Sequence, residues 1–219
     1  MKNEILTKNQ LNFLKEFSQS SFLLKNFYLT GGTALAGFYL GHRYSEDLDF
    51  FSEKEFDLLN IKIFLKKIKK KLGFKKDDLE QSYNRNLIFL HFPDEIVKTE
   101  FTYFPFMRIQ KGKNELGIEI DSLFDIAVNK LFSIYQRSKA RDYVDLYFLC
   151  QKEKYTIEEL VKKARIKFDT HIDFLQLGKQ FIKSQTVDDY PRMIAKIKSK
   201  EWQEFFIGQA LKLKKNILE

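Results

Sequence analysis

The sequence predicts a protein of the α/β (α+β) class, in which a mixed sheet with flanking helices is followed by a helical C-terminal part. Two observations lead to this prediction. Up to residue 121, apolar and alternating runs of strand length are separated by turn residues. From residue 122 onwards, apolar residues recur at helical spacing instead. We therefore expect an α/β domain over residues 1–121 and a helical domain over residues 122–219 packed against it.

The composition is that of a globular protein. Of 219 residues, 44% are hydrophobic, and 23 Phe and 10 Tyr provide material for a core, which excludes a disordered chain. The single cysteine, Cys150, cannot form an internal disulfide. The first residues lack the apolar run of a signal peptide, and the longest uncharged stretch, residues 26–42, is short for a membrane span. These features predict a cytoplasmic location and no membrane partner.

The net charge of +8 is concentrated in one cluster of lysines. No acidic residue occurs between Asp57 and Asp77. The lysines of this cluster are Lys62, Lys66, Lys67, Lys69, Lys70, Lys71, Lys75 and Lys76. A helix over residues 57–72 would bury the stripe Leu58, Ile61, Leu65, Ile68 and Leu72. The opposite face is either a solvated lysine surface or a surface for an anionic partner such as nucleic acid.

The local patterns predict the elements in order. Thr7 is a candidate N-cap for a first helix with Leu11, Leu14 and Phe17 on its inner face. In the first part we then expect a strand over 27–30, a helix over 33–40, a strand over 47–51, the lysine-rich helix, strands within 81–103 with turns at 84–86 and 93–94, and a strand over 117–120. In the second part we expect helices over 122–136, 141–151, 156–167 and 201–218.

The most informative segment is Gly31-Gly32-Thr33, followed by Asp47 and Asp49. Adjacent glycines after a strand allow a tight turn and close approach to a ligand, and a helix starting at Thr33 would favour a phosphate. The two aspartates are two residues apart on a strand, so their carboxylates lie on one face. Since adjacent carboxylates repel each other, such a pair favours a bound cation, for which Mg²⁺ with substrate phosphates is the usual solution. The alternative is a turn and a strand with two exposed acids.

These residues carry a resemblance. Gly31-Gly32-Thr33 with Asp47-x-Asp49 matches the first motif of the DNA polymerase β-like nucleotidyltransferases. The longer run from Leu29-Thr30 to Ala34-Leu35, continued by Gly41-His42-Arg43-x-Ser45-x-Asp47-Leu48-Asp49-Phe50-Phe51, resembles the AbiEii/AbiGii (MenT-like) toxin family. The resemblance extends from about Tyr28 to Leu149 and implies a polymerase β-like fold.

A second motif of that family is a lysine, a hydrophobic residue and an acid, and its counterpart here is Lys98-Thr99-Glu100. Lys98 and Glu100 share one face of the expected strand, which places Glu100 as the third carboxylate. The segment departs from the pattern in two ways: Glu stands where many related transferases have Asp, and Thr99 replaces an aliphatic residue. A surface strand that carries a Lys and a Glu is an alternative interpretation, and Glu119 is a second candidate for the third carboxylate.

Two further motifs lie in the helical part. Lys130 falls within the apolar stripe of its helix, so it either extends to solvent or points into a cleft that contains phosphate; the resemblance implies the cleft. Arg141 and Asp142 begin the next helix, and the resemblance assigns them to the nucleotide site. Arg141 and Asp145 could alternatively form an exposed i,i+4 pair.

Together these features predict a Mg²⁺-dependent nucleotidyltransferase, with Mn²⁺ as a substitute metal, that moves a nucleoside monophosphate from an NTP to an acceptor hydroxyl. The predicted catalytic residues are Asp47, Asp49, Glu100, Lys130 and Asp142, with Asp47, Asp49 and Glu100 as metal ligands; the predicted nucleotide-binding residues are Gly31, Gly32, Thr33, Arg43, Ser45, Lys98 and Arg141. The resemblance further implies a toxin with a cognate antitoxin and the 3′ end of tRNA as acceptor. The alternatives are a protein-modifying nucleotidyltransferase or kinase and a non-catalytic nucleotide- or RNA-binding protein.

Overall fold

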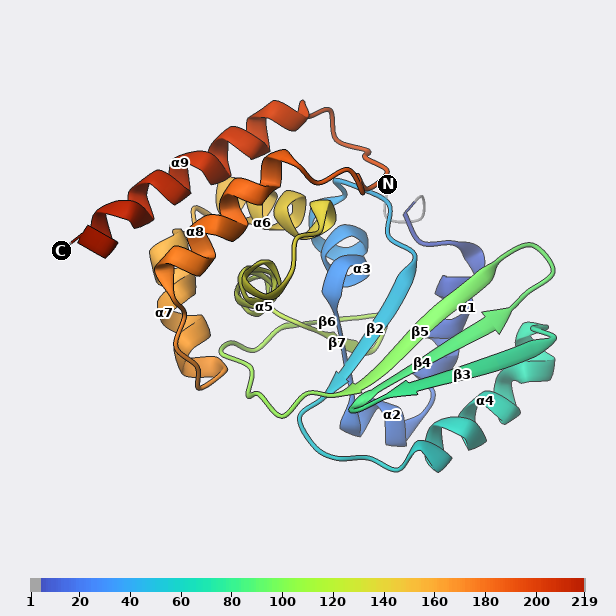
Figure 1. Ribbon diagram of the computed structural model, residues 1–219. Helices are drawn as coiled ribbons and strands as arrows, with labels where there is room; N and C mark the ends of the chain where they lie inside the picture. Colours follow the sequence, from blue (N-terminus) through green and yellow to red (C-terminus); the bar gives the residue numbers. More distant parts are fainter. Residues whose placement is uncertain (1–4, 219) are drawn as a thin grey trace. The chain divides into compact units, whose positions relative to one another are not determined.

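The computed structural model describes residues 5–218, with side chains up to residue 213. Its contacts divide the chain into two compact units, Met1–Ser122 and Leu123–Glu219 (Figure 1). In the described part of the chain, every strand belongs to the first unit, and the second unit is made of helices.

The first unit is built on a seven-stranded mixed sheet in the order β3-β4-β5-β2-β1-β7-β6. Its strands are β1 (Tyr28–Thr30), β2 (Asp47–Ser52), β3 (Lys76–Ser82), β4 (Arg85–His91), β5 (Ile96–Tyr103), β6 (Lys113–Glu115) and β7 (Ile118–Ile120). The central strand β2 pairs parallel with β5 and antiparallel with β1, and β1 pairs parallel with β7. The mixed sheet that the sequence predicts is confirmed.

The helices of this unit are α1 (Lys8–Phe17), α2 (Ser21–Asn26), α3 (Gly31–Leu35), which continues as a π-helical turn over Ala36–Leu40, and α4 (Leu58–Leu72). Thr7 caps α1 as expected: its hydroxyl accepts a bond from the Gln10 amide, and the Gln10 side chain accepts one from the Thr7 amide. Helix α3 begins at Gly31 rather than Thr33, so the paired glycines belong to its first turn.

Helices α1 and α4 cover one face of the sheet through a stack of aromatic rings. Phe50 of β2 stacks on Phe17 of α1 and on Phe101 of β5, with ring centroids 4.3 and 5.2 Å apart. Phe13 of α1 lies between Phe50, at 6.1 Å, and Phe64 of α4, at 5.8 Å. Because successive strand residues point to opposite faces, this core turns the alternate residues of β2 and β5 to the other face of the sheet.

The lysine-rich helix α4 forms as the sequence predicts, capped by Asp57 and ended by Gly73 at a φ of +82°. It buries Ile61, Leu65 and Ile68, together with Phe64, which the predicted stripe omitted. Leu58 and Leu72, at the two ends of the stripe, are only half-buried. Lys69 is half-buried, and the other seven lysines of the cluster are exposed. Lys75 follows the helix, and Lys76 is the first residue of β3.

Helix α4 packs on the face of the sheet that carries Phe50, so its lysines lie on the opposite side of the sheet from Asp47 and Asp49.

Several elements differ from the sequence prediction. Strand β3 begins at Lys76, five residues before the expected start, and pairs along its length with β4. Helix α2 and the edge strand β6 were not expected, because both segments are short and polar. A short helix in the second unit, α8, was missed as well. At the end of β5 and just after it, Tyr103, Phe104 and Phe106 are half-buried.

The second unit consists of α5 (Leu123–Gln136), α6 (Ala140–Glu153), α7 (Ile157–Lys167), α8 (Phe174–Ile182) and α9 (Ser199–Leu218). Helix α5 packs against α6, α7 and α8 (Figure 1). A ring cluster joins α6, α8 and α9: Tyr143 lies 5.1 Å from Phe206 and 6.1 Å from Trp202, and Phe206 lies 5.2 Å from Phe181. Among the helices described, none has the length and apolar character needed to cross a membrane.

A buried ion pair links α7 to α5 within this unit. The Lys167 ammonium lies 2.7 Å from Asp125 Oδ1, and both side chains are fully buried. A buried pair is costly to break, because the remaining partner stays charged in an apolar surrounding.

We expect Asp125→Leu to lower the free energy of unfolding by about 3–5 kcal/mol, since Lys167 would then be a buried charge without its carboxylate. The double variant Asp125→Leu/Lys167→Met should recover most of that loss, because the charge is removed as well. Urea unfolding followed by circular dichroism measures both values. An equal loss in the single and the double variant would show that the ion pair itself does not cause the effect.

Candidate active site

Asp47 and Asp49 lie on one face of β2, opposite to Phe50, as the sequence predicts, and both are half-buried. Register places Asp49 opposite Thr30, the last residue of β1, and therefore beside Gly31. Gly31 has a φ of +74°, and a Cβ at this position would overlap Asp49 Oδ2. A glycine is thus required here both for the backbone conformation and for the close approach of the Asp49 carboxylate.

Arg43 and Ser45 gather around the second glycine. A Cβ on Gly32 would overlap the Arg43 guanidinium and would lie 3.0 Å from Ser45 Oγ. Arg43 is only 3% exposed, and its Nη1 donates to the Tyr44 carbonyl at 2.8 Å. These predicted nucleotide-binding residues therefore lie at one place, where a backbone turn, a guanidinium and a hydroxyl are side by side.

Thr33 and a residue that the sequence did not single out fix this turn in place. The buried Thr33 hydroxyl donates to the carbonyl of Asp47, which joins α3 to the start of β2. Asp121, fully buried, accepts a bond of 2.7 Å from the Thr30 hydroxyl through Oδ2 and one of 3.0 Å from the Ser122 amide through Oδ1. A lone acid at the end of a short strand gives no sequence signal of such a role.

Lys98 and Glu100 face the aspartates from the neighbouring strand. In the parallel pairing of β2 and β5, Asp47 is opposite Lys98 and Asp49 is opposite Glu100. The Lys98 ammonium lies 3.1 Å from Asp47 Oδ2. The structure therefore brings the second motif beside the first, with a cation next to one aspartate and an acid next to the other.

Glu100 is held by an arginine from β4. Arg85 Nε donates to Glu100 Oε1 at 2.8 Å and Arg85 Nη2 to Oε2 at 2.6 Å, and the Thr102 hydroxyl donates to Oε1 at 2.8 Å. Burial alone would raise the pKa of Glu100, but the bonds from Arg85 and Thr102 outweigh it and lower that pKa. We predicted residues 84–86 as a turn and so overlooked Arg85; it starts an alternating strand, which is the signal that could have found it.

Asp47 and Asp49 have the chemistry of a magnesium site. They supply hard oxygen donors from one strand face, and Mg²⁺ is commonly held by one or two carboxylates together with substrate phosphates. Within residues 5–218, no group of three or more His, Cys, Asp and Glu side chains has an arrangement that could hold a metal ion. Asp47 and Asp49 are thus two residues that could hold a metal ion together with a ligand's phosphates.

In the second unit, Lys130 joins two aspartates of α6. Its ammonium lies 2.7 Å from Asp142 Oδ1 and 2.7 Å from Asp145 Oδ2, and all three side chains are buried. Burial would raise the pKa of Asp142, but the attraction of Lys130 outweighs it and lowers that pKa. Arg141 is exposed, whereas Asp145 is fully buried, so the exposed Arg141–Asp145 pair considered from the sequence is wrong.

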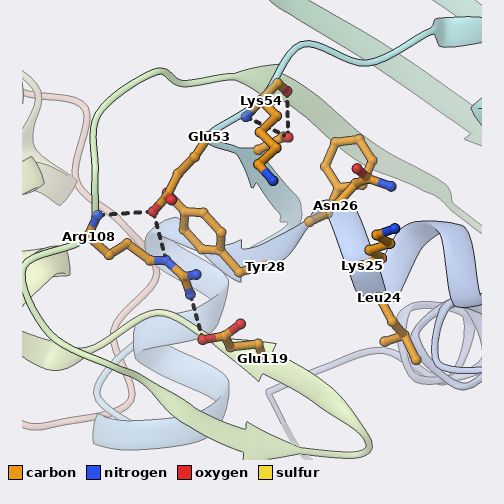
Figure 2. Close-up of a pocket in the computed structure, with 10 residues that line it drawn as sticks. Leu24, Lys25, Asn26, Tyr28, Glu53, Lys54, Arg108 and Glu119 are labelled. Carbon is orange, nitrogen blue, oxygen red and sulfur yellow. Dashed lines mark hydrogen bonds and ion pairs between the residues drawn. The ribbon is translucent and has the colours of Figure 1, made fainter.

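Glu119 lies elsewhere in the first unit. It lines a small pocket of about 90 Å³ at the end of β1 and β2 away from Gly31 and Asp47 (Figure 2). There Arg108 Nη1 lies 2.7 Å from Glu119 and Arg108 Nε lies 3.1 Å from Glu53, while the guanidinium covers the Tyr28 ring at 4.2 Å. The structure thus pairs Glu119 with Arg108 at a separate place and does not bring it to the two aspartates.

Comparison with known proteins supports the same fold. The uncharacterized protein aq_aa25 of Aquifex aeolicus (strain VF5) is 37% identical over 163 residues, which are 73% of this chain and 74% of that protein. JHP933 of Helicobacter pylori has a TM-score of 0.60 at 20% identity and covers 95% of this chain and 90% of its own. MenT4, a nucleotidyltransferase toxin of Mycobacterium tuberculosis, has a TM-score of 0.59 at 13% identity; the match covers 93% of this chain and 82% of MenT4.

The family model described as "Nucleotidyl transferase AbiEii toxin, Type IV TA system" matches residues 12–215, which is nearly the whole chain. The match includes the paired glycines, both aspartates of β2 and the lysine of α5. On this evidence the chain belongs to the AbiEii family of nucleotidyltransferase toxins.

Proposed function

We propose that this nucleotidyltransferase is Mg²⁺-dependent and transfers a nucleoside monophosphate from an NTP to the 3′ hydroxyl of tRNA, and that a cognate antitoxin restrains it. One observation carries the proposal: Asp47 and Asp49 share a strand face, and the Asp49 carboxylate lies against Gly31 at the start of α3. Metal-ligating carboxylates beside a backbone turn suited to phosphate are what nucleotidyl transfer requires.

In the proposed reaction, the acceptor hydroxyl loses its proton to solvent and its oxygen forms a bond to the α-phosphorus, while the bond from the α-phosphorus to the oxygen that bridges to the β-phosphate breaks and pyrophosphate leaves. Asp47 and Asp49 would hold Mg²⁺, which when bound offsets charge on the phosphates and lowers the pKa of the attacking hydroxyl. Arg43 and Ser45, beside Gly32, would bind the triphosphate. Lys98, already next to Asp47, would add positive charge where the transition state develops negative charge.

The resemblance to the family assigns three residues of the second unit to the nucleotide site: Lys130, Arg141 and Asp142. Lys130 is fixed by two buried aspartates, Asp142 and Asp145, which hold its ammonium in one position. Arg141, exposed at the start of α6, is accessible to a ligand. The three residues would orient the nucleotide.

The lysine surface of α4 supports an RNA acceptor. Exposed lysines along one helix make a surface that attracts phosphates without reading sequence. This surface lies behind the sheet, on the opposite side from Asp47 and Asp49. An acceptor that touches both must therefore extend from one side of the sheet to the other, which suits a long folded RNA better than a free nucleotide.

The first test is label transfer. With Mg²⁺, total tRNA and each α-labelled NTP in turn, we expect label in RNA with one NTP. We expect a loss of at least about 100-fold in Asp47→Asn and in Asp49→Asn, because the metal ligands are weakened. Denaturing gels measure both. Label in polypeptide would instead identify a protein acceptor, and bound NTP without any product would favour the non-catalytic binding protein.

The second test concerns the acceptor. We expect Lys66→Gln/Lys67→Gln/Lys70→Gln to raise the KM for tRNA and to flatten its salt dependence, by about one unit of log–log slope for each RNA phosphate that the variant no longer neutralises. The KM for NTP should not change. A matched control removes three exposed lysines of the second unit, Lys162, Lys179 and Lys183. Equal effects of the two triple variants would show general attraction rather than a surface on α4.

The third test measures how the ion pair between Asp142 and Lys130 contributes to stability at acidic pH. Its lowered pKa means that the ion pair with Lys130 stabilises the fold above the unfolded-state pKa and that this contribution is lost as the pH falls through the lower folded-state pKa. We expect the stability of Asp142→Asn to fall less steeply than that of the wild type over this acidic range. Urea midpoints at several pH values measure it, and parallel slopes would contradict the pKa assignment.

A further inference from the structure

Arg85 is an exposed arginine whose guanidinium is held by a buried glutamate, Glu100. It is the first residue of β4, opposite Thr102 of β5, and its side chain reaches diagonally to Glu100. The Arg85 side chain is 51% exposed, whereas that of Glu100 is 8% exposed. Because a guanidinium has five N–H donors and Glu100 accepts two of them, its outer edge retains donors for a further acceptor.

This outer edge lies near the aspartates of the proposed metal site. Glu100 is directly opposite Asp49 in the β2–β5 pairing, and neighbouring strands are about 4.8 Å apart. Both Asp49 and Asp47 add to the attraction of Glu100 in raising the pKa of Arg85, although each acts more weakly than Glu100. A phosphate held at Asp47 and Asp49 would therefore be close to the guanidinium.

Arg108, an arginine of the same unit, differs from Arg85 in its number of acidic partners and in its exposure. Arg108 is bound by two glutamates, Glu53 and Glu119, and is only 22% exposed, so its charge is more than neutralised within the fold. Arg85 has one carboxylate, held in turn by the Thr102 hydroxyl. The arrangement fixes the orientation of Arg85 and leaves its exposed edge toward solvent, which lowers the entropy lost when a ligand binds.

On the basis of the proposed function, we propose that Arg85 is a phosphate-binding residue of the transfer site and that Glu100 is its positioning residue rather than a third metal ligand. The ligand is a phosphate group of a substrate. Planar guanidinium donors match two phosphate oxygens at once. The phosphate belongs either to the triphosphate of the NTP or to the acceptor strand, and separate binding measurements distinguish the two.

The experiment measures equilibrium binding with Mn²⁺ and a non-hydrolysable NTP analogue, or with tRNA alone, so that no turnover is needed. We expect Arg85→Gln to weaken one of the two ligands by about 10-fold or more, since a charge-assisted bond is lost. Arg85→Lys should recover only part of this loss, because an ammonium lacks the planar fork. Arg108→Gln is the matched control and should bind both ligands as the wild type does.

Glu100→Gln tests the positioning role. We expect it to weaken the same ligand as Arg85→Gln, while Mn²⁺ affinity, followed by electron paramagnetic resonance, stays unchanged. Loss of Mn²⁺ binding in Glu100→Gln would make Glu100 a metal ligand and overturn the inference. Unchanged affinity for both ligands in Arg85→Gln, or in Arg85→Lys if the first variant does not fold, would overturn it as well. A wild type that binds neither ligand would instead refute the proposed function.

Discussion

The site of the first unit depends on the pairing of β2 with its two neighbours. Antiparallel pairing with β1 sets Asp49 beside Gly31, and parallel pairing with β5 sets the same residue opposite Glu100. A shift of one residue in either register would turn the aspartates into the aromatic core, since side chains alternate between faces. The register is fixed by Phe50, whose ring stacks on Phe17 and Phe101 on the covered face. Packing of Phe50 on one face of the sheet thus positions Asp47 and Asp49 on the other face.

Charge is distributed between the two faces in different ways. On the covered side, the lysines of α4 are exposed and bear few acidic partners, so they act as a diffuse positive surface. On the face that carries Asp47 and Asp49, two cations lie beside acids: Lys98 beside Asp47 and Arg85 beside Glu100. Such pairing lowers the repulsion among three neighbouring carboxylates, which would otherwise destabilise the folded protein.

The sequence was sufficient for the first motif, because Gly31, Asp47 and Asp49 act through spacing and strand alternation that are visible in one dimension. It was insufficient for Arg85 and Asp121, because their roles arise from pairing between segments far apart in the chain. The two strands that the sequence predicted poorly, β3 at its start and β6 altogether, have a common physical reason. Strand β3 and strand β6 lie at the two edges of the sheet, where charged residues remain solvated and the strand pattern is weak. The burial of Asp145 was likewise hidden, since only the fold shows that Lys130 reaches it.

The departure of this chain from the family pattern at position 100 has a physical explanation in the same geometry. Arg85 is opposite Thr102, not opposite Glu100, so the ion pair runs along a diagonal between strands. Diagonal neighbours are about 7–8 Å apart, within reach of long side chains. The additional methylene of Glu compared with Asp carries the carboxylate farther along this diagonal, and the Thr102 hydroxyl fixes it there. An acid of this length at this position is therefore suited to hold an arginine, while the shorter side chain of Asp49 remains beside Gly31.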